Sequence, residues 1–395
     1  MKSIWIYIYL FFLLFGPKLW TYVDTSILAN FIAFYFIGGH KFKIDSHVLL
    51  LLMWFVFLIL CYMGVAIYYE TIDVVFVGRL VRSMCSFVCI YALCCHYSNV
   101  HIETKIDWII NILLLHAVIV IISALFFVDL QEYLRVINDF ATHVRKYRST
   151  GLMAGYDISG LICNIGVILV LVKTKFNAVK FFIFVVAALL TSRFSMISLS
   201  MILLFYFLSY RKGDSVLKSF CVVVPLIVAG GLGIIILSLT SSGLLPKGLI
   251  SSLNFSSNFL DTLIWTYANS DFKQTTERYF FFPETFLSLL FGAGSYVGTD
   301  PGYVRMINCI GILGLLSVML WHAYLFYIFF STRQSRYFRK EKSQFIGFTL
   351  IAVLVFLNFK NSYFFTGTFF EIMIFILFSY IFESDRYKVE TQYRG

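Results

Sequence analysis

The chain has 395 residues, of which 60% are hydrophobic and 13% charged, and its mean hydropathy is +0.86. Soluble domains carry about 25% charged residues, so this composition excludes a soluble globular protein. The apolar runs approach the length that crosses about 30 Å of hydrocarbon, where a backbone must pair its own polar groups as helix. The sequence therefore predicts an all-α polytopic membrane protein, with residues 1–395 forming a single integral membrane domain.

Hydropathy predicts about twelve transmembrane helices. They lie at 4–21, 24–39, 47–68, 80–97, 106–128, 158–173, 179–192, 194–210, 218–240, 306–330, 345–359 and 365–382. The first resembles a signal peptide, but no small-residue cleavage site follows it, so we expect it to be retained. The seventh and eighth form one apolar run that is broken only at Thr191-Ser-Arg193, where we expect a tight reversal.

Lysine and arginine are concentrated in alternate short loops, which predicts that these loops are cytoplasmic. The cations are Lys41, Lys43, Lys105, Lys173, Lys175, Lys180, Arg211, Lys212, Lys218, Arg333, Arg336, Arg339, Lys340, Lys342, Arg386, Lys388 and Arg394. Both termini are then cytoplasmic, and two large loops, 129–157 and 241–305, face the opposite side. The net charge of +10 is in this interpretation a topology signal and not a nucleic-acid footprint.

The second large loop is a long polar segment rich in aromatic residues, which favours a functional loop over a disordered one. Within it, Phe291-Gly-Ala-Gly294 predicts a tight backbone turn. Asp300-Pro-Gly-Tyr303 follows, and its aspartate is either a functional carboxylate or the cap of a simple turn.

The sequence predicts no metal and no cofactor. All eight cysteines fall inside predicted helices, where thiols serve as small apolar packing residues. The chain has no P-loop, no dinucleotide-binding glycine pattern and no zinc-ligand spacing.

Arginines on the outward side oppose the topology rule and need a separate explanation. They are Arg145, Arg148, Arg193, Arg278 and Arg305. Snorkelling to lipid headgroups is the alternative for each of them, and it is the interpretation kept for Arg79 and Arg82. Because the planar guanidinium group suits phosphate, a cluster of arginines at a membrane boundary suggests a lipid-linked phosphate or diphosphate.

These motifs resemble the O-antigen polymerase and ligase superfamily of bacterial envelopes. The resemblance covers nearly the whole chain as architecture, and its motifs are confined to short patches. The patches are Arg148-x2-Gly151, Leu190-Thr-Ser-Arg193, Arg278, Phe291-Gly-Ala-Gly294, Asp300-x-Gly-Tyr303 and Gly311-x2-Gly314. The ligase branch typically carries a His-Asn pair after the Gly-x-Gly turn, whereas Asp300-Pro-Gly-Tyr303 looks like the polymerase branch.

The resemblance implies a fold of the all-helical glycosyltransferase C type in the bacterial inner membrane, with both large loops periplasmic. It implies polymerisation of undecaprenyl-diphosphate-linked repeat units into O-antigen or a related polysaccharide, by en bloc glycosyl transfer. A chain-length regulator in the same membrane is an implied partner. Two alternatives stay open, an O-antigen ligase that transfers glycan to the lipid A core and a flippase for lipid-linked oligosaccharide.

The implied reaction assigns roles to the candidate residues. Arg148, Arg193 and Arg278 would stabilise the departing diphosphate in place of a metal, with Arg305 as a possible fourth. Asp300 is the candidate base for the acceptor hydroxyl. Substrate-binding candidates are Arg145, Tyr303, Arg305, Gly292, Gly294 and Glu371, the last being also an alternative base or the partner of an arginine. His116, His322, Asn164 and Asn308 are expected to make neutral hydrogen bonds between helices.

Overall fold

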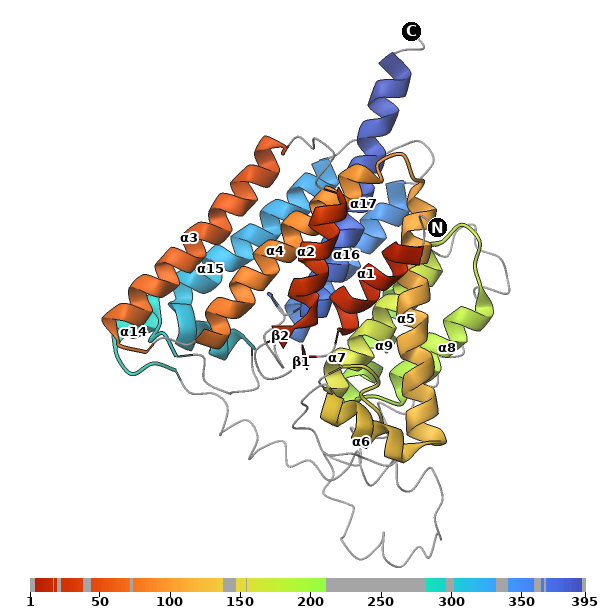
Figure 1. Cartoon of the computed structure of the whole chain (residues 1–395), viewed down its shortest axis with the longest axis horizontal. Coiled ribbons are helices and arrows are strands. Elements are labelled where there is room, and N and C mark those ends of the chain that lie inside the picture. The colour runs from red at the N-terminus through yellow and green to blue at the C-terminus, as the bar shows by residue number, and fades with distance from the viewer. Residues whose placement is uncertain are drawn as a thin grey trace, which may run out of the picture. The chain divides into compact units, whose positions relative to one another are not determined.

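The computed structural model describes most of the chain in ordered helices (Figure 1). The described residues are 4–16, 18–19, 23–37, 44–71, 74–137, 147–153, 155–210, 282–295, 302–331, 340–358, 364–365 and 367–392. Apart from a two-stranded sheet of β1 (Lys18–Leu19) and β2 (Val23–Asp24), the regular structure of these residues is helical.

The helices follow the predicted segments closely. In chain order they are α1 (Ile4–Phe15), α2 (Thr25–Ile37), α3 (Ser46–Tyr68), α4 (Val74–His96), α5 (Ile102–Leu125), α6 (Val128–Ile137), α7 (Tyr156–Val172), α8 (Ala178–Leu189), α9 (Arg193–Tyr210), α14 (Phe286–Phe291), α15 (Gly302–Ser331), α16 (Lys340–Leu357) and α17 (Gly367–Gln392). Every predicted segment among the described residues contains a helix, and the segment 218–240 lies outside them.

Among the described residues, four helices are long and apolar enough to cross a membrane. They are Ser46–Tyr68, Phe76–His96, Ile102–Leu125 and Gly302–Ser331, and shorter apolar helices accompany them. The all-helical, multi-pass membrane class predicted from composition is therefore confirmed in this coarser form.

Several boundaries differ from the predicted ones. The helix expected over 4–21 ends at Phe15, because Gly16-Pro17 follows and a proline disfavours helical geometry in the residue before it. α4 starts at Val74, so Arg79 and Arg82 lie inside this helix and not at its first turn. α15 starts at Gly302, so Arg305 belongs to a helix and not to a loop.

The chain divides into two compact units. The first comprises Met1–Gly16, Asp24–Ile106 and Phe272–Gly395, and the second comprises Pro17–Val23 and Asp107–Asp271. Arg148 and Arg193 belong to the second unit. The glycine motifs, Tyr303, Arg305 and Glu371 belong to the first.

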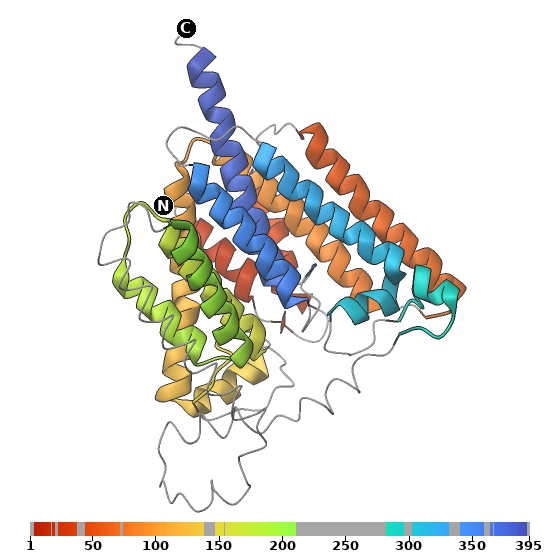
Figure 2. The ribbon, with the colours of Figure 1, turned by 180° about the vertical axis from the view of Figure 1, so that it is seen from behind.

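In the first unit, α4 packs against α2, α3 and α17, and α15 packs against α3, α14, α16 and α17 (Figures 1 and 2). Residues Gly367–Ser379 of α17 are all buried, so this helix forms the centre of the unit. Aromatic rings fill the space around it at tilted or edge-to-face angles, with centroids 4.9–6.1 Å apart. They belong to Phe55, Phe87, Trp321, Phe365 and Phe370.

In the second unit, α7 packs against both α8 and α9 and is buried from Ser159 to Val172. Gly166 permits the close approach of α8, because a side-chain carbon there would collide with the ring of Phe184. The predicted reversal between α8 and α9 is confirmed. It spans Leu190–Ser192, and the Thr191 amide donates to the Ala188 carbonyl at 3.3 Å.

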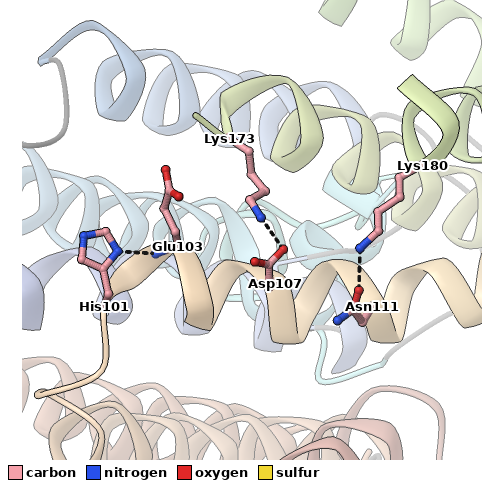
Figure 3. Close-up of polar contacts among 6 residues, drawn as sticks. All are labelled: His101, Glu103, Asp107, Asn111, Lys173 and Lys180. Carbon is pink, nitrogen blue, oxygen red and sulfur yellow. Dashed lines mark hydrogen bonds and ion pairs between the residues drawn. The ribbon is translucent and has the colours of Figure 1, made fainter. Parts of the chain in front are cut away.

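Two lysines, one directly after α7 and one in the first turn of α8, contact polar side chains of α5 (Figure 3). Lys173 Nζ pairs with Asp107 Oδ1 at 2.5 Å, and Lys180 Nζ donates to Asn111 Oδ1 at 2.8 Å. Asp107 and Asn111 are four residues apart and therefore lie on one face of α5. The two contacts hold α5 alongside the α7–α8 pair.

Candidate functional site

Arg148 lies against the turn that joins α8 to α9. Its Nε donates to the backbone oxygen of Thr191 at 2.7 Å, and its guanidinium carbon lies 4.7 Å from the centroid of the Tyr156 ring. The next residue, Ser149, donates its backbone N–H to the Leu190 carbonyl at 3.0 Å. Arg148 is only 7% exposed. Two motifs that are far apart in the sequence, Arg148-x2-Gly151 and Leu190-Thr-Ser-Arg193, therefore meet.

The amino end of α9 begins at this same turn. Ser192 caps the helix, because its Oγ accepts a hydrogen bond from the Ser195 amide at 3.1 Å. Arg193 is the first residue of α9 and follows the Arg148-bound carbonyl of Thr191 by two positions. A helix amino end carries a partial positive charge, and the cation of Arg148 adds to it. The arrangement favours an anion at this end of α9.

Most of the other predicted cations, and the predicted base, lie in parts of the chain that the structure does not describe. Arg145, Arg278 and Asp300 lie outside the described residues, as does the side chain of Arg193. Arg305 is half-buried in the first turns of α15. Of the predicted arginines, the structure brings Arg148 to the segment that bears Arg193.

The two glycine motifs of the first unit, Phe291-Gly-Ala-Gly294 and Gly311-x2-Gly314, lie against each other. Gly292, Gly294 and Gly311 have φ of +91°, +70° and +69°, and α15 kinks at Gly311. The amide of Ala293 donates to the Asn308 carbonyl at 2.8 Å, and the amide of Gly294 donates to the Cys309 carbonyl at 3.2 Å. The predicted tight turn at Phe291-Gly-Ala-Gly294 is confirmed, and its amides bind the helical backbone beside the kink.

This turn is also hydrogen-bonded to α3 and to Thr71, just after the end of α3. Tyr62 donates its hydroxyl to the Gly294 carbonyl at 3.1 Å, and Thr71 donates its hydroxyl to the Ala293 carbonyl at 2.7 Å. A side-chain carbon on Gly292 would collide with the Cys309 carbonyl, and one on Gly311 would collide with the Leu290 carbonyl. Only glycine fits at Gly292 and Gly311, so the turn holds the first half of α15 at a set angle.

Tyr303 joins the start of α15 to the end of α16. Its hydroxyl donates to the Val355 carbonyl at 2.7 Å, its amide donates to the Asn358 carbonyl at 3.2 Å, and its ring meets that of Phe364 edge-on. The phenol proton of Tyr303 is therefore used within the protein, which gives this predicted substrate-binding residue a structural role.

Glu371 is buried, with 1% exposure, at the end of a chain of hydrogen bonds through four helices. Tyr9 of α1 donates to Asn30 Oδ1 of α2 at 3.0 Å, Asn30 Nδ2 donates to Ser86 Oγ of α4 at 2.9 Å, and Ser86 donates to Glu371 Oε1 of α17 at 2.9 Å. In each of these three hydrogen bonds, the donor lies on the side away from Glu371 and the acceptor on the side toward it. Glu371 thus organises the contact among α1, α2, α4 and α17.

Arg82 is a residue whose place the sequence interpretation missed. Its guanidinium lies against Gly367, so that a side-chain carbon on Gly367 would collide with Nη2. Gly367 and Glu371 are one turn apart on α17, as Arg82 and Ser86 are on α4. Arg82 is therefore next to the interface between α4 and the start of α17. The signal available in the sequence was this shared four-residue spacing.

The predicted roles of the neutral polar residues can also be compared with the structure. His116 and Asn164 bond between helices, to Ser159 Oγ at 3.1 Å and to Ser198 Oγ at 2.6 Å. His322 Nε2 contacts the Phe364 carbonyl at 3.2 Å. Asn308, by contrast, donates to the Val304 carbonyl of its own helix at 2.9 Å.

Within the described ranges, no group of three or more histidine, cysteine, aspartate or glutamate side chains could hold a metal ion. No family model matches the chain, and no curated protein matches it.

Replacing Gly292 with alanine should destabilise the protein, because alanine strains the positive-φ backbone by roughly 1–3 kcal/mol and also meets the Cys309 carbonyl. The matched control is Gly64→Ala in α3, where no atom lies within 4 Å of the added carbon and helix propensity favours alanine. Thermal unfolding of the purified protein in detergent would compare them. Equal midpoints for the two variants would show that the turn does not need glycine.

Replacing Glu371 with leucine should destabilise the protein by about 1–3 kcal/mol, because the Ser86 hydroxyl loses its buried acceptor. Glu371→Gln keeps an acceptor oxygen of similar shape and should unfold closer to wild type. Chemical unfolding in mixed micelles would separate the two variants. A leucine variant as stable as the glutamine variant would contradict the role given to this hydrogen-bond chain.

Proposed function

We propose that the chain is a polysaccharide polymerase of the bacterial inner membrane. It lengthens undecaprenyl-diphosphate-linked glycan by transferring the growing chain to the non-reducing-end hydroxyl of a new lipid-linked repeat unit. In this proposal about twelve helices span the membrane, both termini are cytoplasmic, and the segments 129–157 and 241–305 are periplasmic. The resemblance of the motifs to the O-antigen polymerase family supplies the reaction.

The observation that supports this proposal is the contact of Arg148 with the amino end of α9. Diphosphate is the leaving group, and negative charge grows on it as the bond to the anomeric carbon breaks. Fixed cations and helix amides lower the energy of that charge most when they are held in place before the reaction. The Thr191 carbonyl and the Tyr156 ring hold the Arg148 side chain in this way.

The proposed transfer forms one bond at the anomeric carbon and breaks another. The oxygen of the acceptor hydroxyl bonds to the anomeric carbon of the donor glycan, and the bond from that carbon to the diphosphate oxygen breaks. The diphosphate leaves with the bonding electrons and is stabilised by Arg148 and Arg193 of the second unit, and the assignment of Arg278 and Arg305 to the same charge stays a prediction from the sequence. The hydroxyl proton passes to Asp300. Glu371 is the alternative base, and its burial argues for the first assignment.

Purified protein in lipid vesicles should convert lipid-linked repeat units into a ladder of longer glycans, resolved by gel electrophoresis. The ladder should persist in the presence of a chelator, because the arginines supply the positive charge. Leaflet exchange without lengthening would instead indicate a flippase, and transfer only to a lipid A core acceptor would indicate a ligase.

Replacing Arg148 with lysine should slow the ladder reaction about 100-fold, close to the loss in Arg148→Ala. A lysine ammonium is a point charge and cannot bond to the Thr191 carbonyl while presenting a planar fork to diphosphate. Arg79→Lys in α4 is the matched control and should retain activity. An active Arg148→Lys variant would refute the requirement for the guanidinium group.

A further inference from the structure

The loop that carries Arg148, residues 147–153, is hydrogen-bonded to α5 at two points. Ser149 Oγ lies 2.6 Å from Ser123 Oγ, and the amide of Leu152 donates to His116 Nδ1 at 3.2 Å. Ser123, Ser149 and His116 are each 0% exposed. His116 and Ser123 are seven residues apart, which places them on one face of α5, two turns from each other. One face of this helix therefore holds the loop.

Gly151 lets the loop lie flat on this face of α5. Its φ is +53°, and a side-chain carbon there would lie 2.6 Å from Val120 Cγ2 and 2.8 Å from His116 Cε1. The backbone of the loop is thus in direct contact with the imidazole ring. The Ser149 hydroxyl also accepts the Gly151 amide at 2.9 Å, which fixes the shape of the loop between these contacts.

The hydrogen bonds of His116 define its tautomer. Because Nδ1 accepts the Leu152 amide, it carries no proton, and the ring is neutral with its proton on Nε2. Nε2 lies 3.1 Å from Ser159 Oγ and donates to it. One ring nitrogen therefore holds the Arg148 loop, and the other holds α7. Tyr156, whose ring lies beneath the Arg148 guanidinium, is one turn before Ser159 on α7.

We propose that His116 is a positioning residue for Arg148, with Ser123 and Gly151 supporting it. The imidazole fixes the position of the loop backbone relative to α7. It therefore also fixes the distance from the Arg148 backbone to the Thr191 carbonyl and the Tyr156 ring, which hold the guanidinium group. Arginine has many rotamers, and a group that stabilises a transition state has to be held within about 0.5 Å of its productive place. The catalytic consequence rests on the proposed function, whereas the positioning itself can be measured without it.

Two conservative substitutions of His116 separate its two nitrogens. In His116→Asn the amide oxygen is bonded to Cγ, as Nδ1 is, so it can still accept the Leu152 amide. In His116→Gln the amide group reaches the place of Nε2, so it keeps Ser159 and leaves the Leu152 amide unbonded. The pair is matched in polarity, and a histidine that merely fills space would tolerate the two variants equally.

The first measurement is hydrogen–deuterium exchange of the purified protein in lipid nanodiscs. Residues 147–153 should exchange roughly five- to tenfold faster in His116→Gln than in His116→Asn, because one backbone hydrogen bond has been lost. Exchange in the second half of α7 should be the same in both variants. Equal exchange of residues 147–153 in the two variants would overturn the proposal.

The second measurement is the rate of glycan lengthening. His116→Gln should lower kcat about tenfold and leave KM nearly unchanged, His116→Asn should stay close to wild type, and Arg148→Ala should lose no further activity when His116→Gln is added. Equal kcat for the two His116 variants, or additive losses, would overturn the positioning role. If wild type makes no polymer at all, the proposed function fails, and the exchange measurement alone decides whether His116 positions the loop.

Discussion

Buried backbone groups need hydrogen-bond partners in an apolar bundle, and this requirement governs the places where the chain stops being helical. In the loop that carries Arg148, the Ser149 amide donates to the Leu190 carbonyl, and the Leu152 amide donates to the imidazole of His116 on α5. At the Gly292 turn, the partners are the carbonyls beside a kink in α15. In both places a non-helical segment is buried because another segment supplies its donors and acceptors, and this fixes its geometry.

The same two segments hold or support residues that have a role in the proposed reaction. A guanidinium that is bonded on its Nε and packed on an aromatic face has lost most of its freedom before any ligand arrives. Within the first unit, the turn at Phe291–Gly294 has a similar effect, since it sets the direction of the first half of α15, which bears Tyr303 and Arg305. Rigid support of this kind is what the proposed metal-independent glycosyl transfer requires.

The buried carboxyl group of Glu371 illustrates a different use of polarity. Its partners Tyr9, Asn30 and Ser86 come from three other helices and donate toward it in one direction. A polar chain of this kind specifies which helices pack together, because an alternative packing would leave several buried groups unpaired. Glu371 is thereby better explained as a structural centre of the first unit than as a group open to substrate.

The sequence by itself determined the helical class and the location of most helices, since run length, apolar composition and the proline after Gly16 act locally. It also identified the reversal at Thr191 and the turn at Gly292. Only the tertiary structure decided that Arg148 binds the Thr191 carbonyl, 43 residues away, and that Ser86 binds Glu371, 285 residues away. Such pairings depend on how whole helices pack, and a pattern of apolar residues is the same for many packings. For that reason the sequence predicted a hydrogen bond between helices for His116 but not its partners, and it did not predict that Arg82 lies against Gly367.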